Sequence, residues 1–169
     1  MKRTLLILLL VGMLVFAGTA TANAGSRIFV TQLTGANEVP PVETKAAGLA
    51  FFHLSKDGKT LDYTVVVANI KNVVASHIHL GAKDENGPVV TFLFGPAPAG
   101  GGRTTGILAK GTITSADLIG PLEGKCLSDL VDEMRSGNTY VNVHTDDGVA
   151  PPNTGPGDFP AGEIRGQIR

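Results

Sequence analysis

Short runs of β-branched, aliphatic and aromatic residues recur along the chain, separated by Gly, Pro, Asn and Asp. The clearest runs are residues 49–54 and 61–68. Asp57 and Gly58 between them are typical of a hairpin turn, because this pair readily adopts positive φ angles. Six other runs have the same character: 27–33, 73–80, 88–94, 106–113, 139–144 and 163–168. Eight short strands joined by turns predict an all-β domain, an antiparallel sandwich or barrel.

One segment has helical periodicity instead. Four apolar residues follow the i, i+3, i+4, i+7 spacing of one helix face: Leu127, Leu130, Val131 and Met134. Gly137 supplies a C-terminal stop, so we expect one short amphipathic helix over residues 128–135. We expect its apolar face to cover the open end of the sandwich rather than to bind a partner. Cys126, just before it, is expected to be a small buried hydrophobe.

Residues 95–105 and 148–161 contain Pro and Gly at a density that strands do not tolerate, so we expect surface loops there. No internal repeat and no long linker follows residue 24. A single domain over residues 25–169 is therefore predicted. Cys126 is the only cysteine, which excludes an intrachain disulfide.

The first 24 residues have the layout of a secretory signal peptide. Lys2 and Arg3 precede an apolar run over residues 5–16, and small residues lead to Ala24. This run is shorter than the roughly 20 residues of a membrane-spanning helix. We predict cleavage after Ala24 and a mature product, without a membrane span, that is secreted or periplasmic.

Loss of residues 1–24 would remove two positive charges and no negative ones. The formal net charge would change from −1 to −3, with 12 Lys and Arg against 15 Asp and Glu. Phosphate binding needs clustered Lys and Arg, and no such cluster is present. Nucleic acid is therefore excluded as a partner.

Three of the four histidines lie in two predicted strands. His77 and His79 alternate with apolar Ile78 and Leu80, so both rings project from one face of a strand. His144 shares a face with Asn142 in a second strand. If the two strands are neighbours, three imidazoles can meet around a metal ion. Imidazole suits copper, zinc, iron and nickel.

Simpler interpretations stay open for these residues. One alternative is that the paired histidines form a solvated polar face, and another is that His144 is a hydrogen-bonded structural residue. His53 would share a face with Phe51, where it could join the metal site, support a ligand or belong to the core. Carboxylates in loops beside the histidine strands could complete a site or simply be solvated: Asp84, Glu85, Asp146, Asp147 and Asp158.

Five runs also carry a family resemblance. They are LTGANEVPPV at 33–42, LDYTVVV at 61–67, ASHIHLG at 75–81 with NGPV at 86–89, GNTYVNVHT at 137–145, and FPAGEIRGQI at 159–168. Together they resemble the CHRD domain, a module named after chordin and also found in exported bacterial proteins. The resemblance spans nearly all of residues 27–169, and its C-terminal runs are the most specific.

The resemblance implies an immunoglobulin-like, Greek-key sandwich whose histidine layout is similar to the copper half of Cu/Zn superoxide dismutase. By that analogy, His77 and His79 match the paired copper ligands and His144 the late one. Arg165 would match an arginine that guides the anion, although we favour a solvent-exposed charge on an edge strand. In animal chordin, such domains belong to a growth-factor antagonist.

The sequence also departs from superoxide dismutase. Residues 81–113 contain no histidine for a zinc subsite, and a single cysteine cannot form the disulfide. The acidic balance of the predicted mature chain provides no electropositive funnel for an anion. No serine-hydrolase elbow, phosphate loop or HExxH motif is present either.

Three functions follow, in decreasing order of support. The first is non-catalytic sequestration or carriage of copper, with zinc as the alternative metal, by His77, His79 and His144. The second is a protein-binding or matrix module of the cell envelope without metal. The third is a copper-dependent oxidoreductase similar to superoxide dismutase.

Overall fold

The computed structural model describes residues 25–169, and the signal peptide predicted for residues 1–24 lies outside the described residues. The strands are β1 (Ile28–Thr34), β2 (Ala47–Leu54), β3 (Leu61–Lys71), β4 (Val73–Leu80), β5 (Val89–Phe94), β6 (Arg103–Ile113), β7 (Thr139–Thr145) and β8 (Ile164–Gln167). The helices are α1 (Leu127–Arg135) and three short 3-10 turns, η1 (Gly35–Asn37), η2 (Ser115–Asp117) and η3 (Gly120–Leu122).

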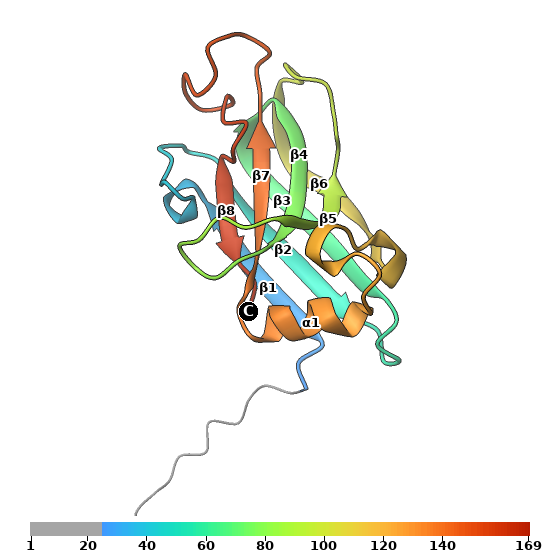
Figure 1. The fold of residues 1–169 in the computed structure, drawn as a ribbon. Helices are drawn as coiled ribbons and strands as arrows, with labels where there is room; N and C mark the ends of the chain where they lie inside the picture. The colour runs from blue at the N-terminus through green and yellow to red at the C-terminus, as the bar shows by residue number, and fades with distance from the viewer. Residues whose placement is uncertain (1–24) are drawn as a thin grey trace, which may run out of the picture.

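The eight strands form one antiparallel sheet in the order β5-β4-β7-β8-β1-β2-β3-β6. Near its middle, β8 and β1 are joined by the single residue pair Thr34 and Arg165, whereas β1 and β2 pair over seven positions. The sheet folds over at this junction, so that β4, β5, β7 and β8 lie in front of β1, β2, β3 and β6 (Figure 1). The predicted all-β, antiparallel Greek-key sandwich is confirmed.

The core lies between the two layers. In β1, Phe29 and Leu33 are buried while Ile28 and Val30 are exposed, the alternation expected of a strand with one face toward the core. In β4, Ile78 is fully buried. The residues on either side of Ile78 therefore project from the outer face of the front layer.

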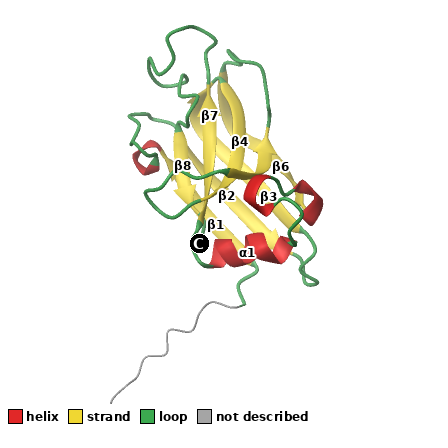
Figure 2. Ribbon diagram, in the orientation of Figure 1, coloured by secondary structure: helices red, strands yellow, loops and turns green. Residues whose placement is uncertain are grey.

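A single residue, Asn72, carries the chain from the back layer to the front layer between β3 and β4. Its side chain accepts a hydrogen bond from the Gly102 N–H and donates one to the Gly157 carbonyl, both at 3.0 Å. This corner ties together the loop over residues 95–102 and the loop over residues 146–163. Both are long surface segments at one end of the sandwich, as predicted, although β6 already begins at Arg103, inside the first predicted loop (Figure 2).

Helix α1 lies at the other end of the sandwich (Figures 1 and 2). Its four predicted apolar residues are all buried, which confirms the amphipathic helix. The prediction that Cys126 is buried is wrong: the residue is exposed. Cys126 precedes the first helical turn, and its N–H bonds the Asp129 carboxylate at 2.8 Å, so the apolar face begins only at Leu127.

No helix within residues 25–169 is long and apolar enough to cross a membrane.

We expect Leu130→Ala to lower the free energy of unfolding by about 2–5 kcal/mol, because it leaves a cavity beneath α1 where Leu130 is fully buried. Ser128→Ala, on the exposed face of the same helix, is the matched control and should change stability by less than about 0.5 kcal/mol. Urea unfolding curves measure both values. Equal midpoints for the two variants would show that α1 does not contribute to the core.

Candidate metal site

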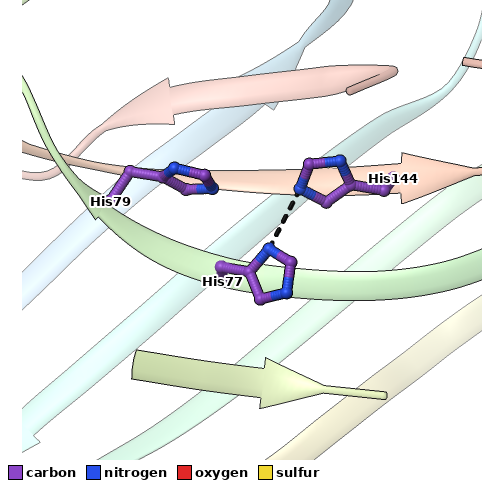
Figure 3. A group of neighbouring side chains, drawn as sticks. All are labelled: His77, His79 and His144. Atoms are coloured by element: carbon purple, nitrogen blue, oxygen red, sulfur yellow. Dashed lines mark hydrogen bonds between the residues drawn. The ribbon is translucent and has the colours of Figure 1, made fainter. Parts of the chain in front are cut away.

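The structure brings His77, His79 and His144 together on the outer face of the front layer. Strands β4 and β7 are neighbours, with Ala75 opposite His144 and His77 opposite Asn142. One ring nitrogen of each histidine lies within 4.8 Å of the others, close enough to hold a metal ion between them (Figure 3). Their role as metal ligands stays a prediction.

His53 does not join this group. It lies in β2 in the back layer, paired with Ile28 of β1, and its side chain is exposed. Its shared face with Phe51 is therefore the solvent face of the opposite layer. The interpretation of His53 as a ligand or core residue is wrong.

Backbone carbonyls fix two of the three imidazoles. His79 Nδ1 lies 2.9 Å from the Gly87 carbonyl oxygen, and His144 Nδ1 lies 2.9 Å from the Pro160 carbonyl oxygen. A carbonyl can only accept, so each Nδ1 carries the proton and each Nε2 keeps a free lone pair. A carbonyl bonded to the second ring nitrogen is the arrangement that orients metal-binding histidines in many proteins.

The Nε2 atom of His79 is buried and has no hydrogen-bond partner among the described residues. A buried polar atom without a partner is costly, and native proteins rarely keep one without a reason. Because its Nδ1 is already used, this nitrogen can be satisfied only by a group that enters the space between the histidines. A metal ion fits that requirement.

His77 faces His144 directly, with 3.0 Å between His77 Nδ1 and His144 Nε2 (Figure 3). Since His144 Nε2 holds a lone pair, His77 Nδ1 donates in this state. A metal ion bound by both atoms would replace this hydrogen bond and leave the proton on His77 Nε2. The edge of His77 also packs against Phe92 of β5, with ring centroids 4.5 Å apart.

All three imidazoles are neutral at neutral pH. Burial, reinforced by the neighbouring imidazoles, lowers the pKa of His77 to about 4. Burial also lowers the pKa of His79 to about 4, against the opposing bond to the Gly87 carbonyl. The pKa of His144 is lowered by burial as well. Metal ions bind neutral imidazole, so the site needs no deprotonation step at pH 7.

Arg165 is not the exposed edge-strand charge that the sequence suggested. It is 1% exposed, and β8 lies between β7 and β1. Its guanidinium donates to the Ala82 and Glu85 carbonyls and to the Asn86 side chain, at 2.8–3.1 Å. Through these bonds, Arg165 holds the loop over residues 81–88, which includes the Gly87 carbonyl that orients His79.

A stack of side chains connects Arg165 to the histidines. The Arg165 guanidinium carbon lies 3.4 Å from the centroid of the Tyr140 ring. The Tyr140 ring stacks on His79 with a centroid distance of 4.7 Å and an angle of 9° between the planes. The Tyr140 hydroxyl also accepts a hydrogen bond from the Gly87 N–H at 3.0 Å. His79 is thus held by contacts with both Tyr140 and the loop.

Sequence reasoning missed Glu38. This carboxyl is 5% exposed, and the Asn142 amide donates to both of its oxygens at 3.2 Å. Burial raises the pKa of Glu38 to about 8, although the charge of Arg165 and the bond from Asn142 oppose the rise. The sequence offered only one sign of this role, an acidic residue within the run over residues 33–42. Local periodicity could not show that Glu38 lies beside β7.

The loop acids do not complete the histidine site. Asp84 and Glu85 are exposed. Asp146, Asp147 and Asp158 gather with one another in a separate group. The described residues therefore offer three imidazoles and no carboxylate at this site.

We expect acid to destabilise the protein through its buried imidazoles. The pKa values of His77 and His79 are about 4 in the folded protein, against 6.5 for an unperturbed histidine. The unfolded chain therefore binds more protons between these pH values. Their contribution to stability is complete above pH 6.5 and is lost as the pH falls toward 4, by at most about 2.7 kcal/mol per pH unit for the pair.

Urea unfolding at pH 7, 6 and 5 tests this expectation. The comparison variant is His77→Gln/His79→Gln, which cannot titrate in this range. Its free energy of unfolding should fall less steeply with decreasing pH than that of the wild type. Parallel profiles would contradict the lowered pKa values.

A comparison with protein-family models covers this site. The CHRD domain family matches residues 29–168, a span that includes the three histidines, Tyr140 and Arg165. Comparisons with curated proteins and with solved structures gave no significant match. The match extends over most of the chain and confirms the resemblance noted in the sequence. The chain belongs to the CHRD domain family.

Proposed function

We propose that this is an exported protein that binds a transition metal, copper foremost, through His77, His79 and His144, and that sequesters or carries it. The observation that carries the proposal is the buried Nε2 of His79, which has no hydrogen-bond partner in the described part of the chain and lies beside two further imidazoles. Export is supported by the signal-like sequence of residues 1–24 and by family membership.

The donor set favours transition metals over calcium and magnesium. Neutral imidazole is a good ligand for copper, zinc, iron and nickel, and Cu²⁺ binds nitrogen sites most tightly among the divalent ions of the first row. Two of the three donors are already oriented by carbonyls. Pre-orientation of ligands lowers the entropy cost of binding an ion. Zinc is the alternative occupant.

Carriage or storage of a metal ion is favoured over catalytic turnover of an anionic substrate. Arg165, the residue that would attract an anionic substrate by analogy with superoxide dismutase, is buried and bonded to the loop over residues 81–88. His77 and His79 are each less than one-tenth exposed. A recessed site with no exposed cation from Arg165 suits retention of an ion better than rapid exchange of a small anion.

A second function, protein binding, is favoured by a different observation. Four apolar side chains on the outer face of the back layer are each more than 40% exposed: Val30, Leu49, Phe51 and Ile107. Val30 lies opposite Phe51 on the neighbouring strand, and Leu49 and Ile107 lie on either side of Val66. Contiguous exposed apolar side chains often mark interaction surfaces. If binding to a partner protein is the main role, replacement of the three histidines should leave that binding intact.

The decisive experiment is a Cu²⁺ titration of the purified protein beside a His77→Ala/His79→Ala/His144→Ala variant. We expect one Cu²⁺ per chain in the wild type and loss of that stoichiometric binding in the variant. His53→Ala is the matched control, because His53 is exposed and lies on the opposite layer. It should retain full binding.

Two outcomes would overturn the proposal. In one, neither copper nor zinc binds the wild type at micromolar concentrations. In the other, copper binds equally well to the wild type and to the triple variant. A copper-loaded protein that consumes superoxide at a measurable rate would instead support the oxidoreductase.

We expect Arg165→Lys to weaken copper binding by about 10–100-fold, the usual cost of disturbing the residues behind metal ligands. Lysine lacks the planar, forked group that reaches three oxygens and stacks on Tyr140. Arg103→Lys is the control, because Arg103 is exposed and bonds only the Asn69 side chain. Competition with a copper chelator measures the affinities, and unchanged affinity in Arg165→Lys would contradict the support assigned to this stack.

A further inference from the structure

A second group of side chains lies where the loop over residues 146–163 meets the loop over residues 95–102. Asp146 and Asp147 directly follow β7, and Asp158 comes later in the same loop. One carboxylate oxygen of each lies within 4.8 Å of the others, so the three side chains face one another. The Gly100 N–H bonds the Asp146 carbonyl at 2.9 Å and holds the two loops together there.

No cationic side chain compensates this group. Within residues 25–169, the only side-chain ion pair is the one between Asp132 and Arg135. Three like charges at such short separation repel each other, most strongly where solvent is partly excluded. Asp146 and Asp147 are half-buried and Asp158 is buried, so water screens them incompletely.

Asp158 shows most clearly that the described residues do not satisfy every oxygen of this group. The residue is 3% exposed. Its Oδ2 accepts hydrogen bonds from the N–H and the hydroxyl of Thr154, both at 2.9 Å. Its Oδ1 is buried and has no hydrogen-bond partner within residues 25–169. A buried carboxylate oxygen without a donor is costly, and a bound cation would offset that cost.

The two partly exposed carboxylates are arranged to leave an oxygen free. Asp146 Oδ1 accepts from the Gly148 N–H at 2.7 Å, and Asp147 Oδ1 accepts from the Val149 N–H at 2.8 Å. These bonds fix the orientation of each carboxylate. The Oδ2 atoms of both residues accept no hydrogen bond from the part of the chain that the structure describes.

We propose that Asp146, Asp147 and Asp158 form a binding site for a hard divalent cation, Ca²⁺. All three donors are carboxylate oxygens, which suit hard cations and not the metals that prefer imidazole or thiolate. Ca²⁺ accepts six to eight oxygens in adaptable geometry, including backbone carbonyls and water, whereas Mg²⁺ demands a strict octahedron. An irregular loop meets the adaptable geometry of Ca²⁺ more easily than a strict octahedron.

The site would also stabilise the loop against β7. The Phe159 N–H, next to Asp158, bonds the Thr145 hydroxyl at 3.0 Å, and the Thr145 N–H bonds the Phe159 carbonyl at 3.2 Å. An ion that joins Asp158 to Asp146 and Asp147 would therefore link the far part of the loop to the end of the strand. Calcium should raise the melting temperature.

The experiment is a calorimetric titration of CaCl₂ into chelator-treated, dialysed protein, with melting temperature as a second readout. We expect one Ca²⁺ per chain with a dissociation constant at or below about 1 mM, as in other extracellular calcium modules. Asp146→Asn/Asp147→Asn should weaken binding at least about tenfold, because it removes two ligand charges. This variant keeps side-chain oxygens for the bonds to Gly148 and Val149.

Asp84→Asn/Glu85→Gln is the control, since it removes the same charge from exposed positions of another loop. It should bind Ca²⁺ like the wild type. The His77→Ala/His79→Ala/His144→Ala variant should also bind Ca²⁺, so failure of the copper site and failure of this site are distinguishable.

Three results would overturn the proposal. The first is no heat and no change in melting temperature at about 10 mM CaCl₂, ten times the expected dissociation constant. The second is equal weakening by the control and by the aspartate variant. The third is stoichiometric binding of Zn²⁺ to these aspartates without binding of Ca²⁺.

Discussion

The arrangement of the front layer depends on Arg165 and its buried guanidinium. The backbone of Arg165 forms the single residue pair that joins β8 to β1. Its side chain bonds three oxygens of the loop over residues 81–88 and stacks on Tyr140. That loop and that ring together hold His79. A buried arginine is tolerated when it is well hydrogen-bonded, and here the guanidinium donates three hydrogen bonds to neutral oxygens without a carboxylate partner.

Because Arg165 is bonded to neutral oxygens, its charge affects the pKa values of groups near the histidine site. Arg165 forms no ion pair with any of the described residues, so its positive charge acts on the surrounding groups. It helps to lower the pKa of His79 and opposes the rise in the pKa of Glu38. Burial is the largest cause of both shifts, so at neutral pH the histidines are neutral and Glu38 is mostly protonated. The site is therefore a set of neutral donors beside one fixed cation.

Local pattern was sufficient to predict the strands, the helix and the shared face of His77 and His79. The meeting with His144 depended on pairing between β4 and β7, which lie some 60 residues apart and carry no local signal for each other. Arg165 was placed wrongly for the same reason: whether a strand is central or at an edge is a property of the whole sheet. The burial of Asp158 arises from the closure of a long loop, which composition alone cannot specify.

The exposed apolar side chains of the back layer, such as Phe51 and Leu49, lie on the outer face opposite to the histidines, with the core between the two layers. A molecule that adheres to a partner through Phe51 and Leu49 would keep its histidines turned away from that partner. Anchorage and ion capture would then not compete for the same surface. If both proposed roles hold, a partner could tether the domain by its back layer while the histidines of the front layer stay accessible to a metal ion.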